Sequence, residues 1–368
     1  METALLVIIG LYFLEHLVFF LGMIRNYRTP KAELTADNLP AVSVIVSARN
    51  EEKNIGQCIE SLVRIDYPRE KLEIILVNDR STDKTGEIML GYGSKHPFIL
   101  YFEPEPSSGK LKGKTNALSQ AIIKSNGEII LTTDADCAVK PAWVREMVRN
   151  YDAGTGVAAT YTIIEPENIY SAIQSFDWIY LLTIASGSDG INLPLSCVGN
   201  NMSFRRKAYD EVGGYENIKF SVTEDFMLLK TIRDKTKWKT KFPVNSKILN
   251  YTLPCESFKE LYRQKKRWGR GGLDIRFIGY IVGLLGWSSG AAMLLGWLFV
   301  SPFTYLMIVL MKILIDLLFV LPVVIRFKVY KVLLYLPFFE IYFALYAFLM
   351  PFILLFDRDV VWKEQKFR

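Results

Sequence analysis

Two aspartates spaced two residues apart give the first indication of chemistry in this sequence. Asp134 and Asp136 follow the apolar run 128–133, and in a regularly continued strand both carboxylates would point to the same face. Such a pair suits a hard divalent cation, Mg²⁺ or Mn²⁺, whose other ligands are phosphate oxygens and water. The alternative is capping of a helix N-terminus, but Pro141 would begin the next helix, which makes capping by Asp136 indirect. The pattern favours a metal site.

A second carboxylate pair lies in Thr223-Glu224-Asp225, ahead of an apolar helical stretch. Acidic residues at a helix N-terminus interact favourably with the helix dipole, so a purely structural role is the alternative. The chain has 38 aspartates and glutamates but only two histidines, His16 and His96. Acid–base chemistry therefore falls to carboxylates rather than to imidazole.

A basic loop at residues 109–116 precedes a predicted helix. Its lysines, Lys110, Lys112 and Lys114, lie among glycines that let the backbone approach a phosphate, while each lysine contributes a point charge. The spacing does not match the GxxxxGK[ST] pattern of P-loop nucleotidases. A solvated basic loop is the alternative, and the loop taken alone leaves both interpretations open.

Alternating strands and helices must position these residues. The sequence predicts strands at 42–47, 73–78, 99–102 and 128–133, with helices at 51–63, 82–89 and 112–124 between them. Strands buried on both faces and separated by helices indicate an α/β fold with a mostly parallel sheet. Ligands of such sheets bind beyond the carboxyl ends of the strands. Three polar clusters should therefore converge on one crevice: Ala48-Arg49-Asn50-Glu51, Asn78-Asp79-Arg80 and Asp134-Ala135-Asp136.

The composition divides the chain into a globular segment and apolar ends. Of the 368 residues, 51% are hydrophobic and 22% are charged, and the two classes occupy different segments. At about 20 residues per span, the predicted spans are 5–23, 278–300, 303–325 and 332–356. We expect an anchor at 1–24, a cytoplasmic catalytic domain with juxtamembrane interfacial helices at 25–277, a membrane region at 278–356 and a charged tail at 357–368.

The flanks of the apolar runs bear on targeting and topology. A cleaved signal peptide is the alternative for the first run, but no small-x-small site follows it, and Arg25, Arg28 and Lys31 favour an anchor with this flank inside. Four full spans would place the C-terminus outside, although its basic residues favour the inside. Either one C-terminal segment is re-entrant or interfacial, or the charge rule fails here. The basic tail residues are Arg358, Lys363, Lys366 and Arg368.

Charge and cysteine usage exclude other classes. The net charge of +6 comes with Lys and Arg gathered beside the apolar segments, which suggests anionic lipid headgroups rather than nucleic acid. The four cysteines are far apart and form no CxxC pair, which argues against a zinc site or a disulfide framework and favours a reducing compartment.

The ordered set of motifs resembles one known family. In order, the motifs are Ser-Ala-Arg-Asn-Glu-Glu52, Asn-Asp79, Lys114-Thr-Asn-Ala-Leu118, Asp134-Ala-Asp136, Gly199-Asn-Asn201, Thr-Glu-Asp225 and Gln-Lys-Lys-Arg-Trp268. Over residues 41–270 this set resembles the family-two glycosyltransferases with the GT-A fold. More narrowly, it is similar to the branch with D, DxD, TED and QxxRW motifs, which includes cellulose, hyaluronan and chitin synthases and ceramide glucosyltransferase. Alone, the last motif would also fit a basic and aromatic anchor beside a membrane.

The resemblance implies a role for each matching residue. Glu51 and Asp79 would hold the base and ribose of the nucleotide, Lys114 would contact the nucleotide or its diphosphate, and Asp134 and Asp136 would sit at the Mg²⁺ or Mn²⁺ ion, with Asp136 the more direct ligand. Asp225 would be the general base with Glu224 beside it, Gln264 and Arg267 would brace the diphosphate, and Trp268, Asn200 and Asn201 would face the acceptor. Two departures bear on the base contacts: Ser47-Ala48-Arg49 replaces a proline and an aromatic residue, and Asn78 stands where a second aspartate is frequent.

The implied reaction is an inverting transfer of a sugar from a nucleotide-diphosphate sugar, expected to be a UDP-sugar, to an acceptor. About four apolar segments with few polar residues offer little to line an export channel, which favours one transfer to a lipid or other membrane-borne acceptor at the cytoplasmic face of the cell membrane. Processive polysaccharide synthesis is the alternative; a nucleotidyltransferase or an inactive membrane scaffold fits less well. Lys312 and Asp316, four residues apart in the third segment, should pair with each other or contact a polar headgroup. The sequence leaves the oligomeric state open.

Overall fold

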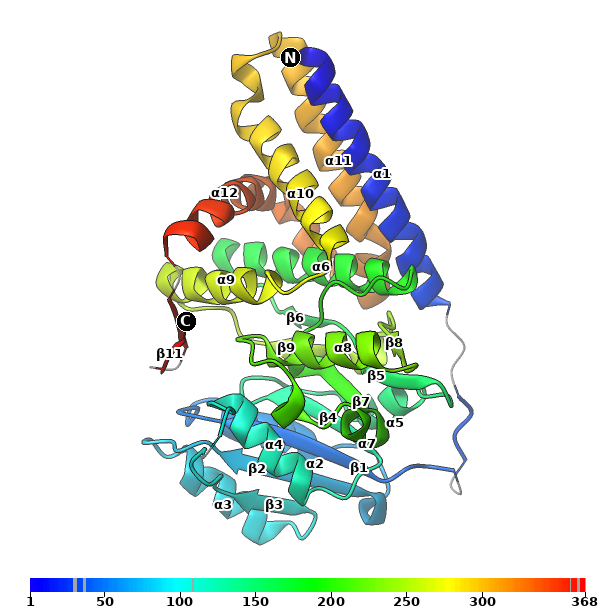
Figure 1. Cartoon of the computed structure of the whole chain (residues 1–368), viewed down its shortest axis with the longest axis vertical. Helices are drawn as coiled ribbons and strands as arrows, with labels where there is room; N and C mark the ends of the chain where they lie inside the picture. The colour runs from blue at the N-terminus through cyan, green and yellow to red at the C-terminus, as the bar shows by residue number, and fades with distance from the viewer. Residues whose placement is uncertain (29–31, 36–37, 108, 358, 363–364, 368) are drawn as a thin grey trace. The chain divides into compact units, whose positions relative to one another are not determined.

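The computed structural model describes residues 1–28, 32–35, 38–107, 109–357, 359–362 and 365–367, which form two compact units. A helical unit contains Met1–Tyr27, Ile164–Ser196 and Pro254–Arg368, and a sheet unit contains Arg28–Ile163 and Cys197–Leu253 (Figure 1). Among the charged residues considered above, Lys31, Arg358, Lys363 and Arg368 lie outside the described residues.

A sheet of seven strands, counted over the described residues, organises the sheet unit. Its order is β3-β2-β1-β4-β7-β5-β8; β1 pairs in parallel with β2 and β4, and β7 runs antiparallel between β4 and β5. The mostly parallel α/β sheet that the sequence predicts is thus confirmed. The strands are β1 (Val42–Ala48), β2 (Leu72–Asn78), β3 (Ile99–Phe102), β4 (Ile129–Asp134), β5 (Thr155–Ala159), β7 (Met202–Arg205) and β8 (Lys239–Lys241); β6 (Thr162–Ile164) pairs separately with β9 (Asn250–Thr252).

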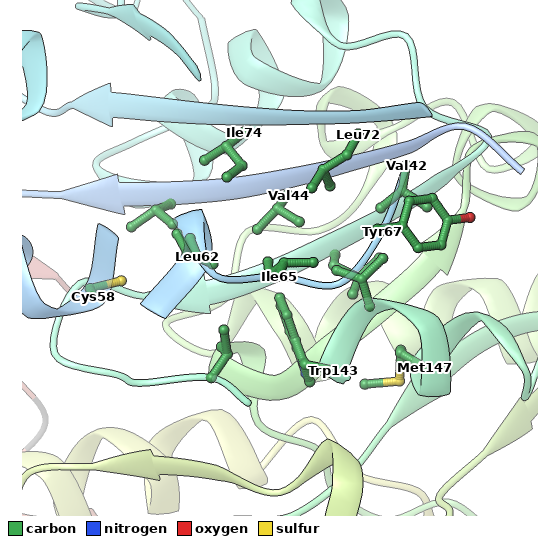
Figure 2. Close-up of a cluster of buried hydrophobic side chains, with 14 of the residues drawn as sticks. Val42, Val44, Cys58, Leu62, Ile65, Tyr67, Leu72, Ile74, Trp143 and Met147 are labelled. Carbon is green, nitrogen blue, oxygen red and sulfur yellow. The ribbon is translucent and has the colours of Figure 1, made fainter. Parts of the chain in front are cut away.

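Helices and 3₁₀ turns connect the strands and cover the sheet. They are α2 (Ile55–Val63), α3 (Thr85–Lys95), α4 (Lys114–Lys124), α5 (Trp143–Val148), α7 (Arg206–Glu211) and α8 (Glu224–Lys235), with 3₁₀ turns η1 (Arg69–Lys71), η2 (Gly199–Asn201), η3 (Tyr215–Asn217) and η4 (Ser246–Ile248). In Figure 2, Val44 and Ile74 of the strands pack with Leu62 and Trp143 in one buried cluster. Burying each such side chain stabilises the fold by about 1.5–3 kcal/mol.

The carboxyl ends of three neighbouring strands finish level with one another. Ala48 pairs with Asn78, and Ser47 pairs with Asp134. A slip of one residue would turn the apolar side chains of a strand away from the core, so the core also fixes where each strand ends. The polar residues that follow the three strands therefore emerge at one edge of the sheet, as the sequence predicts.

The helical unit contains the apolar segments. Its helices are α1 (Glu2–Tyr27), α6 (Ile169–Gly190), α9 (Phe258–Gly272), α10 (Phe277–Leu295), α11 (Pro302–Phe327) and α12 (Leu336–Phe356), with η5 (Gly296–Leu298), η6 (Tyr330–Tyr335) and a hairpin of β10 (Val360–Trp362) and β11 (Gln365–Phe367). Within the described residues, four segments are long and apolar enough to cross a membrane. They are Glu2–Tyr27, Phe277–Leu298, Pro302–Phe327 and Tyr330–Phe356, which match the four expected segments.

Helix α6 belongs to the helical unit, and its residues lie within the segment 25–277 predicted as the catalytic domain with its juxtamembrane helices. It packs along α1 at a contact of glycines, where a Cβ on Gly22 would overlap the carbonyl oxygen of Gly187, and a Cβ on Gly190 would overlap that of Gly22. Asn26 of α1 also donates to the carbonyl oxygen of Ser186 at 2.7 Å. Small residues let two helix backbones approach this closely, so α6 joins the helices rather than the sheet.

The charged pair inside the third apolar segment is confirmed and is part of a larger buried cluster. Lys312 Nζ lies 2.8 Å from Asp316 Oδ2 and 2.5 Å from Glu340 Oε2 of α12. Tyr12 of α1 donates to Asp316 Oδ1 at 2.7 Å, and the hydroxyls of Tyr12 and Tyr180 of α6 lie 2.7 Å apart. The cluster thus joins α1, α6, α11 and α12 through polar groups that bond one another.

The ends of α1, α10 and α11 define the direction of each helix. Thr304, near the start of α11, donates to Glu2 at 2.8 Å, and Gly296, just after α10, lies beside Leu5. The end of α10 and the start of α11 are therefore both near the N-terminus of α1. Because α10 and α11 are each about 30–40 Å long at 1.5 Å per residue, α10 begins and α11 ends at the opposite end of the bundle.

The fourth apolar segment, formed by η6 and α12, begins and ends at that same opposite end. The six-residue 3₁₀ helix η6 follows the end of α11 after two residues and leads directly into α12. Directly after the last residue of α12, Asp357 lies 2.5 Å from Lys266 Nζ and accepts from Tyr262 at 2.8 Å; both partners are on α9, the helix that precedes α10. The fourth apolar segment therefore returns to the end of the bundle from which it starts.

Candidate active site

Lys114 connects carboxylates from two other elements of the sheet unit. As the first residue of α4, it places Nζ 2.6 Å from Asp134 Oδ1 at the end of β4 and 3.3 Å from Glu224 Oε1 at the start of α8. The side chains of Lys114 and Glu224 are 18% and 12% exposed, whereas that of Asp134 is 36% exposed. Three motifs separated by up to 110 residues in the sequence thus meet through one ammonium group.

The charge of Lys114 is held by its neighbours. Burial alone would favour the neutral amine, but the carboxylates of Asp134, Glu224 and Asp225 more than offset this and raise the pKa of Lys114 well above its ordinary value. A permanently charged lysine beside a surface-facing carboxylate can bind the oxygens of a phosphate.

Asp225 is held by the backbone of the turn η2. Its Oδ2 accepts from the N–H of Gly199 at 2.5 Å, and its Oδ1 accepts from the N–H of Phe226 at 2.8 Å. A Cβ on Gly199 would lie 3.1 Å from both Cβ and Oδ2 of Asp225, so glycine is what allows this approach. The carboxylate is fixed beside Glu224 at the N-terminus of α8, where negative charge interacts favourably with the helix dipole.

Asp136 lies two residues beyond Asp134 and is partly exposed. Its Oδ2 accepts from Thr252 at 3.3 Å, and its Oδ1 accepts from the Cys137 thiol at 3.5 Å. Burial, followed by the charges of Asp136 and Asp134, raises the pKa of the Cys58 and Cys137 thiols, so both stay protonated and are poor metal ligands. Any metal here would be held by carboxylate oxygens.

The described residues contain no cluster of three or more His, Cys, Asp or Glu side chains arranged to hold a metal ion. The two aspartates alone supply part of a coordination shell. This fits Mg²⁺ or Mn²⁺, which commonly take one or two carboxylates and complete their shell with substrate phosphates and water. It does not fit a closed structural zinc site, which needs four protein ligands.

The loops that follow β1 and β2 are tied to each other. Asn50 Oδ1 accepts from the N–H of Thr82 at 2.8 Å, and Thr85 Oγ1 accepts from the N–H of Glu51 at 2.7 Å. The Glu51 side chain accepts from Asn54 at 2.9 Å. These crossed bonds hold Glu51 at the edge of the sheet where β2 also ends.

Asp79 follows β2 directly and is 2% exposed. Its Oδ1 accepts from the guanidinium of Arg80 at 3.1 and 3.2 Å, and Arg80 adopts the left-handed backbone conformation, with φ of 58°. The strained residue therefore turns its side chain back onto the preceding carboxylate. Non-glycine residues in this conformation are uncommon and concentrate at functional sites.

The structure explains the asparagine that precedes Asp79. Asn78 Nδ2 donates to Glu103 Oε1 at 2.9 Å and lies 3.3 Å from the Tyr101 hydroxyl, while its Oδ1 accepts from the N–H of Ser81 at 3.1 Å. An aspartate here would set two carboxylates against each other. Asn78 is thus matched to Glu103.

Asn200 and Asn201 are buried in the sheet unit. Asn201 is fully buried; its Oδ1 accepts from Trp143 Nε1 at 2.9 Å, and its Nδ2 donates to two backbone carbonyls, those of Tyr161 and Ile248. Asn200 Oδ1 accepts from Thr162 at 2.8 Å. These bonds hold the η2 turn in place, and the expected contact of both residues with the acceptor stays a prediction.

A pocket of about 390 Å³ lies beside the carboxylates. Glu224 forms part of its wall, together with Lys110 and Thr115 from the α4 end and Tyr215 and Lys219 from the segment around η3. The lining combines charged groups of both signs with two aromatic rings, those of Tyr215 and Phe220. Its size and polarity suit a small polar ligand.

Gln264, Arg267 and Trp268 lie on α9 of the helical unit. Gln264 and Trp268 are four residues apart and so share a face of the helix. Trp268 packs edge-on against Trp178 of α6, with ring centroids 5.2 Å apart. The expected roles of these three residues at the diphosphate and acceptor stay predictions.

Comparison with known proteins identifies the family. The model for Glycosyl transferase family group 2 matches residues 129–356, more than half of the chain, and the model for Glycosyl transferase family 2 matches residues 43–213. The chain belongs to glycosyltransferase family 2. The α/β sheet accordingly has the GT-A fold of that family.

Several curated relatives of this glycosyltransferase are known. It is 29% identical over 275 residues to a probable glycosyltransferase, YdaM, of Bacillus subtilis. That match covers 72% of this chain and 64% of the relative. The chain is 28% identical over 250 residues to a beta-monoglucosyldiacylglycerol synthase of Synechocystis (66% and 49%) and 24% identical over 266 residues to a poly-beta-1,6-N-acetyl-D-glucosamine synthase of Staphylococcus aureus (70% and 60%). The transferase thus spans about half to two thirds of the length of these relatives.

A solved structure shares the fold over nearly the whole chain. The mannosyltransferase PcManGT of Pyrobaculum calidifontis, in complex with GDP-Man and Mn²⁺, superposes with a TM-score of 0.59 at 17% identity and covers 97% of this transferase and 99% of that protein. At this identity the likeness bears on the fold alone. It agrees with the α/β sheet and with the helices at both ends.

Two groups at the site of the transferase went unassigned in the sequence analysis. Arg80 stands inside the quoted Asn-Asp-Arg cluster, and its place after a strand is a signal that could have found it. The Gly199 N–H, which holds Asp225, leaves no such signal because a backbone donor has no residue type.

Proposed function

We propose that this transferase moves a sugar from a nucleotide-diphosphate sugar, most simply a UDP-sugar, to a lipid acceptor, with inversion and with a divalent metal ion. The observation that supports this most directly is the arrangement of Asp225. One carboxylate is fixed by Gly199 beside the chain of contacts that runs from Glu224 through Lys114 to Asp134. A base and a phosphate-binding cation are thus held together.

Asp225 would act as the general base. As the acceptor hydroxyl attacks C1 of the sugar, its proton passes to the carboxylate of Asp225; the new O–C1 bond forms while the bond from C1 to the diphosphate oxygen breaks. A single displacement of this kind inverts C1. The nucleoside diphosphate leaves as an anion, so the site needs positive charge at the phosphates and no proton donor.

Asp134 and Asp136 would hold the metal ion, which supplies Lewis-acid stabilisation of the departing diphosphate. Both carboxylates are partly exposed, whereas the thiols near them are buried and protonated. The Lys114 ammonium lies 2.6 Å from Asp134, which indicates that this carboxylate favours a cation. Lys114 would then turn to a phosphate oxygen when the donor binds.

The nucleoside would lie at the loops after β1 and β2. Glu51 and Asp79 are held there by crossed loop bonds and by Arg80. The pocket beside Glu224 would receive the transferred sugar, since its polar lining offers donors and acceptors to sugar hydroxyls.

A lipid acceptor is supported by the relatives and by the polar groups of the bundle. The beta-monoglucosyldiacylglycerol synthases bear a name that specifies a glucosylated lipid, so diacylglycerol is the first acceptor to test. The poly-beta-1,6-N-acetyl-D-glucosamine synthases make processive polymerisation the second candidate. Against it, Lys312, Asp316 and Glu340 bond one another, which leaves less to line a polar channel.

We further propose three membrane passes with a re-entrant α12. The chain leaves the bundle after α1 at the end where the fourth apolar segment, η6 and α12, both begins and ends. The sheet unit and the C-terminal tail would then share the cytoplasmic side, which reconciles the basic tail with the charge rule. A reporter fused to the C-terminus tests this: green fluorescent protein should fluoresce and alkaline phosphatase should be inactive, and the reverse would mean a fourth full crossing.

The reaction is tested with the purified full chain in nanodiscs containing dioleoylglycerol. We expect nucleoside diphosphate, not pyrophosphate, to appear with one of a panel of UDP-sugars and GDP-mannose, to depend on Mn²⁺ or Mg²⁺, and to accompany a solvent-extractable glycolipid. Label in a non-extractable polymer would instead select the processive candidate.

Replacing the base separates chemistry from binding. Asp225→Asn should lower turnover by about two to four orders of magnitude, the usual range for a general base, while nucleotide-sugar binding measured by calorimetry persists. Asp210→Asn, the same change at an exposed aspartate on α7, is the matched control. Full turnover in Asp225→Asn would show that another group takes the proton.

A further inference from the structure

A buried ion pair joins α9 to α6 within the helical unit. Lys265 of α9 contacts the Asp177 carboxylate of α6, and the two residues are 3% and 0% exposed. The Lys265 ammonium also lies over the ring of Trp268, 4.1 Å from its centroid. Because Lys265 and Trp268 are three residues apart, they share the face of α9 that meets α6.

Aromatic rings surround this pair. Trp178, the neighbour of Asp177, meets Trp268 edge-on with ring planes at 79°, and the ammonium lies 5.5 Å from the ring centroid of Tyr346 on α12. An ammonium over a ring is attracted most strongly where water is excluded. Trp268 is therefore held by one cation and one ring, and the cation is itself held by Asp177.

The pair adds little net stability, because burying two charges costs about as much as their attraction returns. Asp177 Oδ2 is engaged by Lys265 and by the Tyr342 hydroxyl at 3.4 Å, while Oδ1 has no hydrogen-bond partner within the described part of the chain. Burial raises the pKa of Asp177, and the ammonium of Lys265 opposes that rise. Removing one partner would leave the other charge buried and uncompensated, so each partner constrains where the other lies.

We infer that Asp177 is a positioning residue for the acceptor: through Lys265 it fixes the orientation of Trp268. The inference rests on the proposed function, in which Trp268 lies at the acceptor. With Asp177 neutralised, Lys265 loses its counter-ion in an aromatic environment and turns away, and Trp268 loses the cation over its face. The acceptor then binds a less ordered surface, while the donor-binding groups of the sheet unit keep their own contacts.

The test compares Michaelis constants for the full chain with UDP-glucose and dioleoylglycerol in mixed micelles. For Asp177→Asn we expect the KM for dioleoylglycerol to rise about tenfold, with less than a twofold change in the KM for UDP-glucose. The double variant Asp177→Asn/Lys265→Met leaves no unpaired buried charge, so it should fold and show the same rise. Lys265→Arg keeps the charge and should stay near the wild type.

Lys266→Met is the matched control. Lys266 is the next residue of α9, and it is also buried and also forms an ion pair, with Asp357. Within the described residues, the ammonium that lies over the Trp268 ring belongs to Lys265, not to Lys266. We expect it to leave the KM for dioleoylglycerol within twofold. An equal effect of Lys266→Met, or equal changes in both Michaelis constants of the double variant, would overturn the positioning role.

A second measurement needs no acceptor. Acrylamide quenching of Trp268, obtained as the difference between each protein and its Trp268→Phe form, should increase in the double variant. If the wild type forms no glucosyl lipid, diacylglycerol and UDP-glucose are the wrong substrates for the proposed function. Unchanged acrylamide quenching of Trp268 in the double variant would still refute the role of Asp177.

Discussion

Replacing Lys114 by methionine tests whether the lysine and a metal ion compete for Asp134. Removing one partner of a fully buried pair costs about 3–5 kcal/mol. Asp134 is 36% exposed, and solvent screening weakens the contact. We therefore expect Lys114→Met to lower the free energy of unfolding of the metal-free protein by about 2 kcal/mol. For a domain of about 150–250 residues this shifts the melting temperature by about 4–8 °C.

Metal binding should stabilise Lys114→Met more than it stabilises the wild type. In the wild type a cation must share Asp134 with an ammonium 2.6 Å away, whereas the variant offers the carboxylate without a competitor. A ligand at about one hundred times its dissociation constant stabilises a protein by about 2.7 kcal/mol. Saturating Mn²⁺ should therefore raise the melting temperature of Lys114→Met more than that of the wild type and close most of the gap.

The assay is thermal denaturation followed by intrinsic fluorescence, with and without Mn²⁺. Lys112→Met removes the same charge from an exposed site of the same loop and should behave as the wild type. The folded pKa of Lys114 is raised, so its stabilisation is complete below the unfolded value of about 10.4 and is lost only as the pH rises through the folded value. The difference in melting temperature between Lys114→Met and the wild type should be constant from about pH 6 to 9. Equal stabilisation of both proteins by Mn²⁺ would refute the shared site.

Two further changes test the fixed groups around the site. Asn78→Asp places a carboxylate against Glu103 and raises the folded pKa of the pair. The variant's free energy of unfolding, measured by thermal denaturation, should match that of the wild type at about pH 4 and fall below it by about 1–2 kcal/mol as the pH rises to 7. Adding Glu103→Gln should remove this loss, and a loss that does not depend on pH would contradict the repulsion. Gly199→Ala adds a methyl group 3.1 Å from Asp225 Oδ2 and should lower kcat about tenfold with an unchanged KM for the donor, whereas an unchanged kcat would mean that the base does not need this contact.

Much of the fold could be predicted from the sequence because its signals are local. Strands such as Val42–Ala48 are continuous β-branched runs, and the apolar segments are recognisable by length and composition alone. The ordered motifs also indicated the family, which the family models confirm. Carboxylates that follow strands could be expected at one edge, since parallel strands end on the same side.

Other features depend on neighbours that are distant in the sequence. Residue type does not reveal that Asn78 is matched to Glu103, or that α6 leaves the sheet unit to pack on α1 through Gly22 and Gly187. The apolar length of α12 predicted a span, whereas the return of Asp357 to α9 depends on a tertiary contact.

The sequence by itself determined the family, the sheet, the apolar segments and the residue types at the site, because each of these follows from patterns of residues close together in the sequence. Only the tertiary structure decided which groups meet: Lys114 with Asp134 and Glu224, the Gly199 N–H with Asp225, and Asp177 with Lys265. The physical reason is that a charge is stabilised by whatever lies within a few ångströms of it. That neighbour is set by the packing of elements far apart in the chain.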